Sequence, residues 1–372
     1  MDNRKVIIIG GGLAGLTAAI HLSKAGVSVK VFEKNTFPKH KVCGEYISNE
    51  VTPYLNFLDI DIESLHPVQI TKTSISTVSG KQIDGKLPLG GFGVSRYAFD
   101  QLLYEKALAS GCEIIRETVI DSTLMQKGFL VTTSDNVKYE ADIVLGAFGK
   151  RANIDQKLQR NFIQKKSPWL AVKAHYTGTF PDDVVALHNF RGGYCGVSKV
   201  ENGAINVCYL ADFESFKKYK DIEEYQEKVV SENPKLKAIF QNAPLFKPLT
   251  ISQISFENKL PVENHILMIG DTAGLIHPLC GNGMAMAIHS AKIASELVLE
   301  YLIGVIHSRK LLEKKYAIAW NTRFRRRMQT GRLLATLLRK EKTAAFLMKL
   351  LTVFPSMLPI IIKRTHGKPI TI

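Results

Sequence analysis

The sequence predicts an α/β fold in three parts: a parallel-sheet domain, an inserted antiparallel β-sheet domain and a helical C-terminal region. Three observations predict these parts. Residues 6–33 show the pattern of a strand, a glycine-rich turn, a helix and a second strand. Residues 170–253 alternate in short β-like segments with turn signals between them. Most of the chain beyond Tyr301 has the pattern of helices.

Length and composition fit such a fold. At 372 residues the chain can form one or two intimately joined domains, and its 45% of apolar residues excludes a disordered chain. The net charge of +15 is unevenly placed. Sixteen Lys/Arg residues against Glu313 and Glu341 give residues 301–372 a charge of +14. The basic character therefore belongs to one segment of the chain.

The five cysteines are an odd number and show no C-x-x-C or metal-ligand spacing. We therefore expect a reducing, cytoplasmic compartment and no metal site. No signal peptide is expected, because the first apolar stretch already belongs to the glycine-rich turn. The best candidate for a membrane span, residues 346–362, is broken by Lys349, Pro355 and Pro359.

The N-terminal segment carries the strongest motif. Val6–Ile9 is an unbroken apolar run, as expected for a strand that helices cover on both faces of a parallel sheet. A G-x-G-x-x-G motif follows. Gly10 allows the tight turn, Gly12 lets the backbone approach a pyrophosphate, and Gly15 lets the helix Leu13–Lys24 pack closely. The helix start offers free N–H groups to that anion.

Glu33 ends the second strand, residues 27–32, eighteen residues after Gly15. A carboxylate at this position accepts hydrogen bonds from ribose hydroxyls and repels a 2′-phosphate, so the segment favours FAD or NAD over NADP. Leu13, Ala14 and Lys34 are expected to line the same site. The alternative is a glycine-rich turn in a βαβ unit that holds no ligand.

A basic loop follows at residues 37–45, with Cys43 and Gly44 near its end, and a helix is expected from about Asn49. Residues 68–94 alternate around several glycines, which indicates a hairpin.

Ser95 and Arg96 open a helix expected over residues 97–110. Strands are expected at residues 112–115, 129–133 and 143–145, and the last runs into the small-residue turn 146–150.

The antiparallel part begins at Leu170. Strands are expected at residues 171–176, 184–190, 193–200 and 204–210. Asn202-Gly203 is a strong hairpin signal between the last two. A helical insert over residues 222–240 is expected to break at Pro234.

The chain then returns to the parallel sheet with a strand at residues 265–269. Gly270 and Asp271 follow at the strand end, where open α/β sheets place ligand groups. A long helix is expected from Asn282 and Gly283 to about Tyr301, and its start again offers free N–H groups.

Four features together resemble the flavin-dependent family with the p-hydroxybenzoate hydroxylase fold, and within it the geranylgeranyl reductase group. They are the G-x-G-x-x-G motif with Glu33, Arg96 ahead of a helix, the turn Gly146-Ala147-x-Gly149, and Gly270-Asp271 with the Gly281-x-Gly283 helix. The resemblance covers roughly residues 4–300. Its most group-specific part is Lys41–Glu45, which resembles the Cys-Gly loop that geranylgeranyl reductases carry beside flavin and substrate.

The resemblance implies a Rossmann-type FAD-binding domain, a substrate domain inserted into it and a basic helical region. The first would comprise residues 1–67, 95–169 and 256–300, the second residues 68–94 and 170–255, and the third residues 301–372.

By the same resemblance, Glu33 would hold the adenosine ribose, Gly12 and Arg96 the pyrophosphate, and Asp271 the ribityl chain. The isoalloxazine would lie near Gly281, Asn282, Gly283 and Met284, and the cofactor would also meet Gly10, Cys43, Gly44, Gly149 and Gly270. Two separated features, one for each half of a long dinucleotide, favour FAD over a released nicotinamide cofactor.

Two alternatives remain open for these residues. Gly270-Asp271 could be an ordinary turn with a capping aspartate. Arg96 could be a solvated or paired arginine at a helix end.

The sequence departs from the family pattern in places. Phe148 replaces the aspartate of the usual Gly-Ala-Asp-Gly turn. A second G-x-G-x-x-G motif after a strand is absent, so no separate nicotinamide domain is expected. The Trp-x-Trp-x-Ile-Pro motif of flavin-dependent halogenases is also missing, because Trp169 and Trp320 are isolated.

The resemblance implies an FAD-dependent oxidoreductase that acts on an apolar substrate and reduces carbon–carbon double bonds of an isoprenoid or polyene-like compound. NAD(P)H or another reductant would be the transient electron donor. Cys43 would shape the site or relay a proton, against the alternative of an ordinary buried thiol. His277 is a further catalytic candidate, against the alternative of a loop histidine satisfied by the backbone.

Two other functions compete with this hypothesis. One is a monooxygenase or halogenase-like flavoprotein that uses oxygen, and the other is a non-catalytic flavin or lipid carrier.

The basic tail has three interpretations. It could be a solvated helical face. It could make peripheral contact with the inner face of a membrane, because Lys349, Lys363 and Arg364 flank an apolar cluster of Leu347, Leu350, Leu351, Phe354, Met357 and Leu358. Nucleic acid is disfavoured, since no binding motif accompanies the charge. The oligomeric state is left open.

Overall fold

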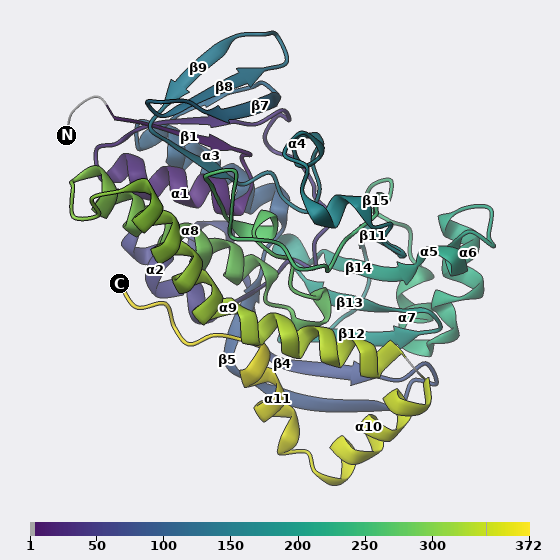
Figure 1. Cartoon of the computed structure of the whole chain (residues 1–372). Coiled ribbons are helices and arrows are strands. Elements are labelled where there is room, and N and C mark those ends of the chain that lie inside the picture. Colours follow the sequence, from purple (N-terminus) through teal and green to yellow (C-terminus); the bar gives the residue numbers. More distant parts are fainter. Residues whose placement is uncertain (1–3, 340) are drawn as a thin grey trace.

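The computed structural model describes residues 4–339 and 341–372, which form three β-sheets with helices around them (Figure 1). The first sheet has six strands in the order β16-β17-β10-β1-β2-β6. Five of them are parallel neighbours: β1 (Lys5–Ile9), β2 (Ser28–Phe32), β6 (Glu113–Ile115), β10 (Ile143–Gly146) and β17 (Ile266–Met268). β16 (Val262–Glu263) is an antiparallel edge strand.

The chain adds β2 and β6 on one side of β1, and β10 and β17 on the other, so the strand order reverses between β1 and β10. Chain connections leave these two neighbours toward opposite sides, which opens a crevice at their carboxyl ends. The helices α1 (Leu13–Lys24), α3 (Arg96–Ala109) and α8 (Gly283–Leu302) pack on the sheet, with α1 against both others. The largest apolar core of the described residues surrounds these elements.

The second sheet has eight strands in the order β15-β11-β14-β13-β12-β4-β5-β3. They are β3 (Tyr46–Ser48), β4 (Val68–Ser76), β5 (Gln82–Gly93), β11 (Trp169–Tyr176), β12 (Val184–Phe190), β13 (Gly193–Lys199), β14 (Ile205–Asp212) and β15 (Leu249–Ser252). All neighbours are antiparallel except β12 and β4, which run parallel. The predicted hairpin at residues 68–94 therefore joins the inserted strands in one sheet.

The strand β3 was not expected from the sequence. It brings residues 46–48, directly after the Cys43 loop, to the edge of the eight-stranded sheet. The helix expected from about Asn49 follows as a 3₁₀ turn (Asn49–Val51) and α2 (Thr52–Phe57). The loop is thus fixed between the two large sheets.

Smaller elements complete the body. A third sheet contains β7 (Val119–Leu124), β8 (Phe129–Thr133) and β9 (Lys138–Ala141), and α4 (Asn153–Lys157) follows β10. One face of the eight-stranded sheet carries α5 (Phe213–Phe216), α6 (Ile222–Lys228) and α7 (Pro234–Phe240) over a separate apolar core. The predicted break at Pro234 is confirmed: α6 ends before it, and Pro234 begins α7, where its missing N–H needs no partner.

The C-terminal region consists of α9 (Arg309–Arg339), α10 (Glu341–Val353) and α11 (Met357–Thr365). Figure 1 shows α9 running from the side of α8 to the eight-stranded sheet, with α10 and α11 beyond β4 and β5. The chain then returns to the body, where the Ile370 N–H donates to the Glu50 carbonyl at 2.8 Å.

Candidate functional site

The glycine-rich turn lies at the carboxyl end of β1. Gly10 has a φ of +108°, and a Cβ there would lie 2.4 Å from the carbonyl oxygen of Ala147. A Cβ on Gly15 would lie 1.9 Å from the carbonyl oxygen of Gly10. Both positions therefore exclude a side chain. Gly12 differs, because the nearest atom to its Cβ position is Nη2 of Arg96 at 3.9 Å, so this backbone faces open space beside a guanidinium.

The starts of α1 and α8 are similar electrostatically. Neither helix has an acidic residue in its first turn, and neither N-cap residue, Gly12 or Asn282, makes a side-chain capping bond. The first N–H groups of both helices therefore have no carboxylate or cap from their own first turn, although the Glu50 carboxylate accepts from the Asn282 side chain at 3.1 Å. Such helix starts favour an anion or a polarised carbonyl.

Gly270 joins these two helix starts. A Cβ at Gly270 would lie 2.9 Å from the Cβ of Ala14 on α1 and 3.6 Å from that of Ala287 on α8. Its N–H donates to Ser290 Oγ at 2.8 Å, and its φ is +61°. The Asp271 side chain, partly exposed, follows at once. Three of the four sequence features therefore meet in one crevice.

The turn after β10 is also tied to this place. The Gly149 N–H donates to Thr272 Oγ1 at 2.7 Å, one residue past Asp271. Phe148, which stands where the family has an aspartate, is partly buried against the main apolar core. The residue at this position therefore makes an apolar contact and presents no carboxylate.

Glu33 is buried beside the glycine turn. Its Oε2 accepts from the Gly11 N–H at 2.9 Å, and its Oε1 accepts from the backbone and side-chain N–H groups of Asn35 at 2.9 and 2.6 Å. The carboxylate is therefore fixed at the end of β2. Lys34, next to it, is exposed.

Arg96 is both close to Gly12 and paired. Its guanidinium donates to the two carboxylate oxygens of Asp100 at 2.7 and 2.8 Å, and Lys41 Nζ lies 2.9 Å from the same carboxylate. Burial disfavours the charge on Arg96, but Asp100 outweighs it and raises the pKa of the guanidinium. The paired-arginine alternative is thus correct for the contact with Asp100, and the same pair holds the guanidinium beside Gly12.

Cys43 lies where its loop crosses the start of α8. Its Sγ is 3.3 Å from Sδ of Met284, in the first turn of that helix. The Gly44 carbonyl accepts from Asn206 Nδ2 of β14 at 2.8 Å. The loop is therefore wedged between α8 and the eight-stranded sheet, with the Cys43 thiol free and partly exposed. Gly281, with a φ of +61°, packs against Tyr46 just beyond it.

A buried ionic cluster lies behind this loop, and the sequence analysis did not predict it. Glu45, fully buried with a φ of +52°, accepts from Lys173 Nζ at 2.7 Å and from the Arg96 N–H at 2.7 Å. Its other oxygen lies 2.6 Å from His175 Nε2. Burial by itself raises the pKa of Glu45, but His175 and Lys173 hold it below its usual value. The available signal was Lys173 and His175 inside an otherwise apolar strand.

His277 is not satisfied by the backbone, so that alternative was wrong. Both ring nitrogens are buried and have no hydrogen-bond partner among residues 4–339 and 341–372. The ring packs instead among Phe256, Tyr194 and Trp169, with centroids 4.6, 5.7 and 6.2 Å away. Burial lowers the pKa of His277 to about 4, so the imidazole is neutral at pH 7.

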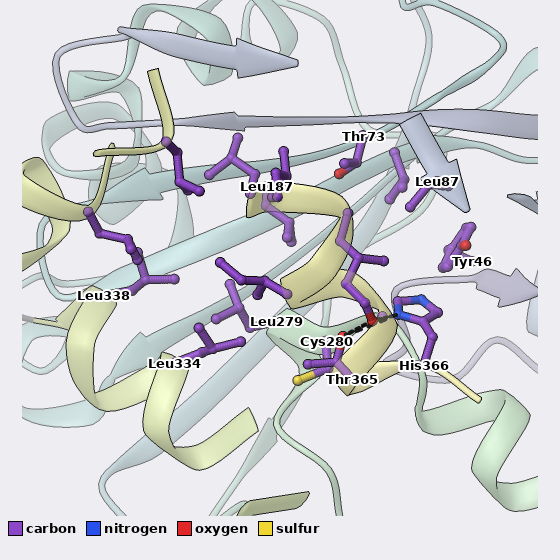
Figure 2. A pocket seen from close by; sticks show the side chains of 18 of the residues that line it. Tyr46, Thr73, Leu87, Leu187, Leu279, Cys280, Leu334, Leu338, Thr365 and His366 are labelled. Atoms are coloured by element: carbon purple, nitrogen blue, oxygen red, sulfur yellow. Dashed lines mark hydrogen bonds between the residues drawn. The ribbon is translucent and has the colours of Figure 1, made fainter. Parts of the chain in front are cut away.

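An apolar pocket adjoins Gly281 and Cys280. It holds about 810 Å³ of empty space, part of it open to solvent, between the eight-stranded sheet and the C-terminal helices. Figure 2 shows Leu334 and Leu338 of α9 facing a pocket whose other walls include Leu187 and Leu87 of the sheet. Among the described residues, the lining includes no Asp, Glu, Lys or Arg. The remaining lining residues are Tyr46, Thr73, Ile75, Val185, Leu279, Leu347, Met348, Leu351, Leu358, Ile361, Ile362, Thr365 and His366.

Across the described ranges, no group of three or more His, Cys, Asp or Glu side chains is placed to hold a metal ion.

Comparison with known proteins identifies similar sequences. Residues 5–42 match the family model described as FAD dependent oxidoreductase. The chain is 23% identical over 349 residues to conditioned medium factor receptor 1 of Dictyostelium discoideum, covering 86% of this chain and 68% of that protein. It is 22% identical over 320 residues to digeranylgeranylglycerophospholipid reductase of Methanoculleus marisnigri, covering 80% and 76%.

Solved structures are similar over most of the chain. The flavin-dependent brominase Bmp2 superposes with a TM-score of 0.79 at 17% identity, covering 96% of this chain and 92% of that one. A geranylgeranyl bacteriochlorophyll reductase-like protein from Thermoplasma acidophilum gives a TM-score of 0.73 at 19% identity, covering 91% and 89%. The predicted α/β fold and the resemblance noted in the sequence are both confirmed.

Proposed function

From the motif and fold that this chain shares with FAD-dependent oxidoreductases, we propose that it reduces carbon–carbon double bonds of an apolar, isoprenoid or polyene-like compound. The relative from Methanoculleus marisnigri is named a reductase of a digeranylgeranyl lipid, which supports this choice. The observation that carries the proposal is the apolar pocket that adjoins Gly281 at the start of α8, whose described lining residues include no Asp, Glu, Lys or Arg.

The crevice fits FAD by its own geometry. Gly10 and Gly15 leave no room for side chains, Gly12 faces open space beside Arg96, and Glu33 closes the far end. The free start of α1 suits the pyrophosphate, and Asp271 suits the ribityl hydroxyls. The start of α8 suits a polarised carbonyl of the isoalloxazine.

When bound, FAD would supply the hydride for the reduction. The chain's own residues would orient the substrate and deliver a proton. The pocket walls would hold the apolar chain and exclude water, and Gly281 would let it approach the start of α8 closely. Cys43, a free thiol against Met284, is the proton donor that this arrangement favours.

Spectroscopy tests the cofactor and the reaction together. The purified protein is expected to show a flavin band that bleaches anaerobically with NAD(P)H or another donor. It is expected to recover, without oxygen, when a polyprenyl compound with reducible double bonds is added. Recovery only with oxygen, and oxygen incorporated into the product, would favour the monooxygenase or halogenase-like alternative. A flavin that no donor reduces would favour a carrier.

A pair of neighbouring variants tests the pocket. Leu338 lines it, whereas Leu337, the next residue of α9, is an exposed apolar side chain. Leu338→Trp is expected to lower kcat/KM for the polyprenyl compound by about tenfold or more, because losing good contact for a few methylenes costs roughly 1–3 kcal/mol. Leu337→Trp is expected to leave kcat/KM unchanged. Equal effects from both variants would show that the substrate binds elsewhere.

A further inference from the structure

The helices α10 and α11 are apolar on two sides. One side lines the pocket through Leu347, Leu351 and Leu358. On the outside, Phe346, Val353, Phe354 and Ile360 are exposed by 69%, 62%, 53% and 56%. Helices with apolar residues all round are normally buried, and a large exposed apolar patch marks an interaction site. The outer side of these helices therefore lacks a partner in the described chain.

The position of these helices suits contact with a large surface. In Figure 1 the turn that joins them lies at the edge of the molecule away from the six-stranded sheet. Val353 and Phe354 stand at this turn. No described helix is by itself both long enough and apolar enough to cross a membrane. Phe346–Val353 and Met357–Thr365 qualify only as a pair, bent by 118°. A bent pair on the outside suits a shallow insertion.

The charges around the exposed apolar side chains of α10 and α11 indicate which kind of partner fits this surface. Residues 342–372 contain five Lys/Arg and no Asp or Glu. Lys349, Lys363, Arg364 and Lys368 are exposed. A second copy of the chain would match the apolar side chains but repel these cations, and a nucleic acid would match the cations only. An anionic bilayer offers both an apolar interior and negative headgroups.

We propose that α10 and α11 dock on an anionic phospholipid bilayer, with Val353 and Phe354 inserted at the acyl boundary. The pocket behind these helices then takes its apolar ligand from the same bilayer. The second statement rests on the proposed function, whereas the docking itself does not. Binding to vesicles without substrate therefore separates the two.

Co-sedimentation of the whole chain with vesicles tests the docking. The chain is expected to bind phosphatidylcholine vesicles that contain phosphatidylglycerol, to bind phosphatidylcholine alone much more weakly, and to dissociate as salt rises. The double variant Val353→Asp/Phe354→Asp is expected to lose binding by at least about tenfold. The control Ile303→Asp/Val305→Asp changes two similarly exposed residues, 58% and 57%, between α8 and α9, and is expected to bind normally.

Charge variants test the orientation. Lys363→Glu/Arg364→Glu is expected to weaken binding by about thirtyfold or more, which corresponds to roughly 1 kcal/mol for each cation at the surface. The control Lys310→Glu/Lys314→Glu reverses two exposed cations near the other end of the C-terminal region. It is expected to have a smaller effect, because these residues lie at the start of α9.

Several results would overturn the proposal. These are no binding to the anionic vesicles at low salt, equal losses from test and control variants, or normal binding by the Val353/Phe354 variant. A protein mass that falls from dimer to monomer in that variant would assign the patch to a second copy. If binding holds but no double bond is reduced, the docking stands and the proposed function fails.

Discussion

At the scale of single residues, residues of the same type that lie close together in the sequence have very different surroundings. Gly12 faces open space, whereas Gly10 and Gly15 meet backbone atoms. Arg326 is exposed, whereas Arg327 is buried against Glu50. The sequence identified the glycine motif because its spacing has a mechanical reason. The sequence did not show that Arg327 is buried while the neighbouring arginines are exposed, because its ion-pair partner Glu50 is distant in the sequence.

Gly12 offers a test of cofactor binding that spares the fold. Gly12→Glu places a carboxylate at the uncapped start of α1, where its Cβ meets nothing closer than 3.9 Å. We expect FAD affinity to fall by about a hundredfold or more, since opposing like charges costs several kcal/mol. Flavin titration measures the loss. Gly12→Ala is expected to keep most of the affinity, and circular dichroism is expected to be unchanged in both variants.

His277 gives stability a pH dependence with a defined sign. Its pKa falls from 6.5 to about 4 on folding because it is buried. Below pH 6.5 the unfolded chain therefore binds a proton at His277 that the folded chain does not bind. The free energy of unfolding falls for this reason as the pH is lowered from 6.5 toward 4. Between pH 7 and pH 5, the wild type is expected to lose about 2 kcal/mol more than His277→Leu in urea unfolding. The exposed His307→Leu is the control and is expected to behave as wild type. Parallel losses in wild type and His277→Leu would contradict this expectation.

At the scale of elements, local sequence patterns predicted helices and turns correctly, but they did not predict which distant strands pair. The helix predicted at Leu13–Lys24 has those bounds in the structure. Asn202-Gly203 forms the predicted turn between β13 and β14, with φ values of 61° and 71°. The parallel contact of β12 with β4 and the added strand β3 depend on long-range packing, which leaves no local pattern.

The cluster of Glu45, Lys173 and His175 also depends on long-range packing. It joins the Cys43 loop to β11 across 128 and 130 residues of chain. The resemblance to geranylgeranyl reductases predicts a role for the loop, but it does not predict the strand residues that hold the loop in place. Burial with complete pairing explains why charged residues are tolerated in this strand.

Removing one partner of this cluster is expected to be costly. Lys173→Met leaves the Glu45 carboxylate without its cation in the interior, and we expect a loss of about 3–5 kcal/mol in the free energy of unfolding. Adding Glu45→Gln should restore part of it. Lys72→Met, in the exposed pair with Asp183, should cost less than about 1 kcal/mol. Similar losses for Lys72 and Lys173 would show that the buried cluster is not special.

The Glu45 carboxyl also sets a lower pH limit. Its pKa is held below the usual 4.5, so its contribution is present above that value and lost as the pH falls through the folded pKa. The stability difference between wild type and Glu45→Gln is therefore expected to shrink in acid.

At the scale of the molecule, the basic C-terminal region is partly structural. Arg327 of α9 lies 3.3 Å from Glu50 and donates to Asn282 at 3.1 Å, at the start of α8. Asn282 in turn donates to Glu50 at 3.1 Å. The interpretation of the tail as a purely solvated face is therefore wrong for Arg327, although Arg323, Arg325 and Arg326 are exposed.

Arg327→Met tests this connection. Burial raises the pKa of Glu50, and Arg327 opposes that effect. Without the guanidinium, we expect a loss of about 3–5 kcal/mol at pH 7 that becomes smaller as the pH falls and Glu50 is protonated. Arg326→Met, on the exposed side, is expected to change the free energy of unfolding by less than about 0.5 kcal/mol. A pH-independent loss would exclude an unpaired carboxylate as its cause.

The pocket closes only when distant parts of the chain meet. The walls on β4 and β5 are complete at Gly93, but Leu334 of α9 comes roughly 240 residues later, a delay on the order of ten to fifty seconds during synthesis. Throughout that interval, Ile75 and Leu87 lack the cover that α9, α10 and α11 give them. A ribosome stalled between Gly93 and Leu334 would expose an incomplete sheet with uncovered apolar side chains. The yield of folded protein in cells is therefore expected to depend on chaperones that shield the nascent strands.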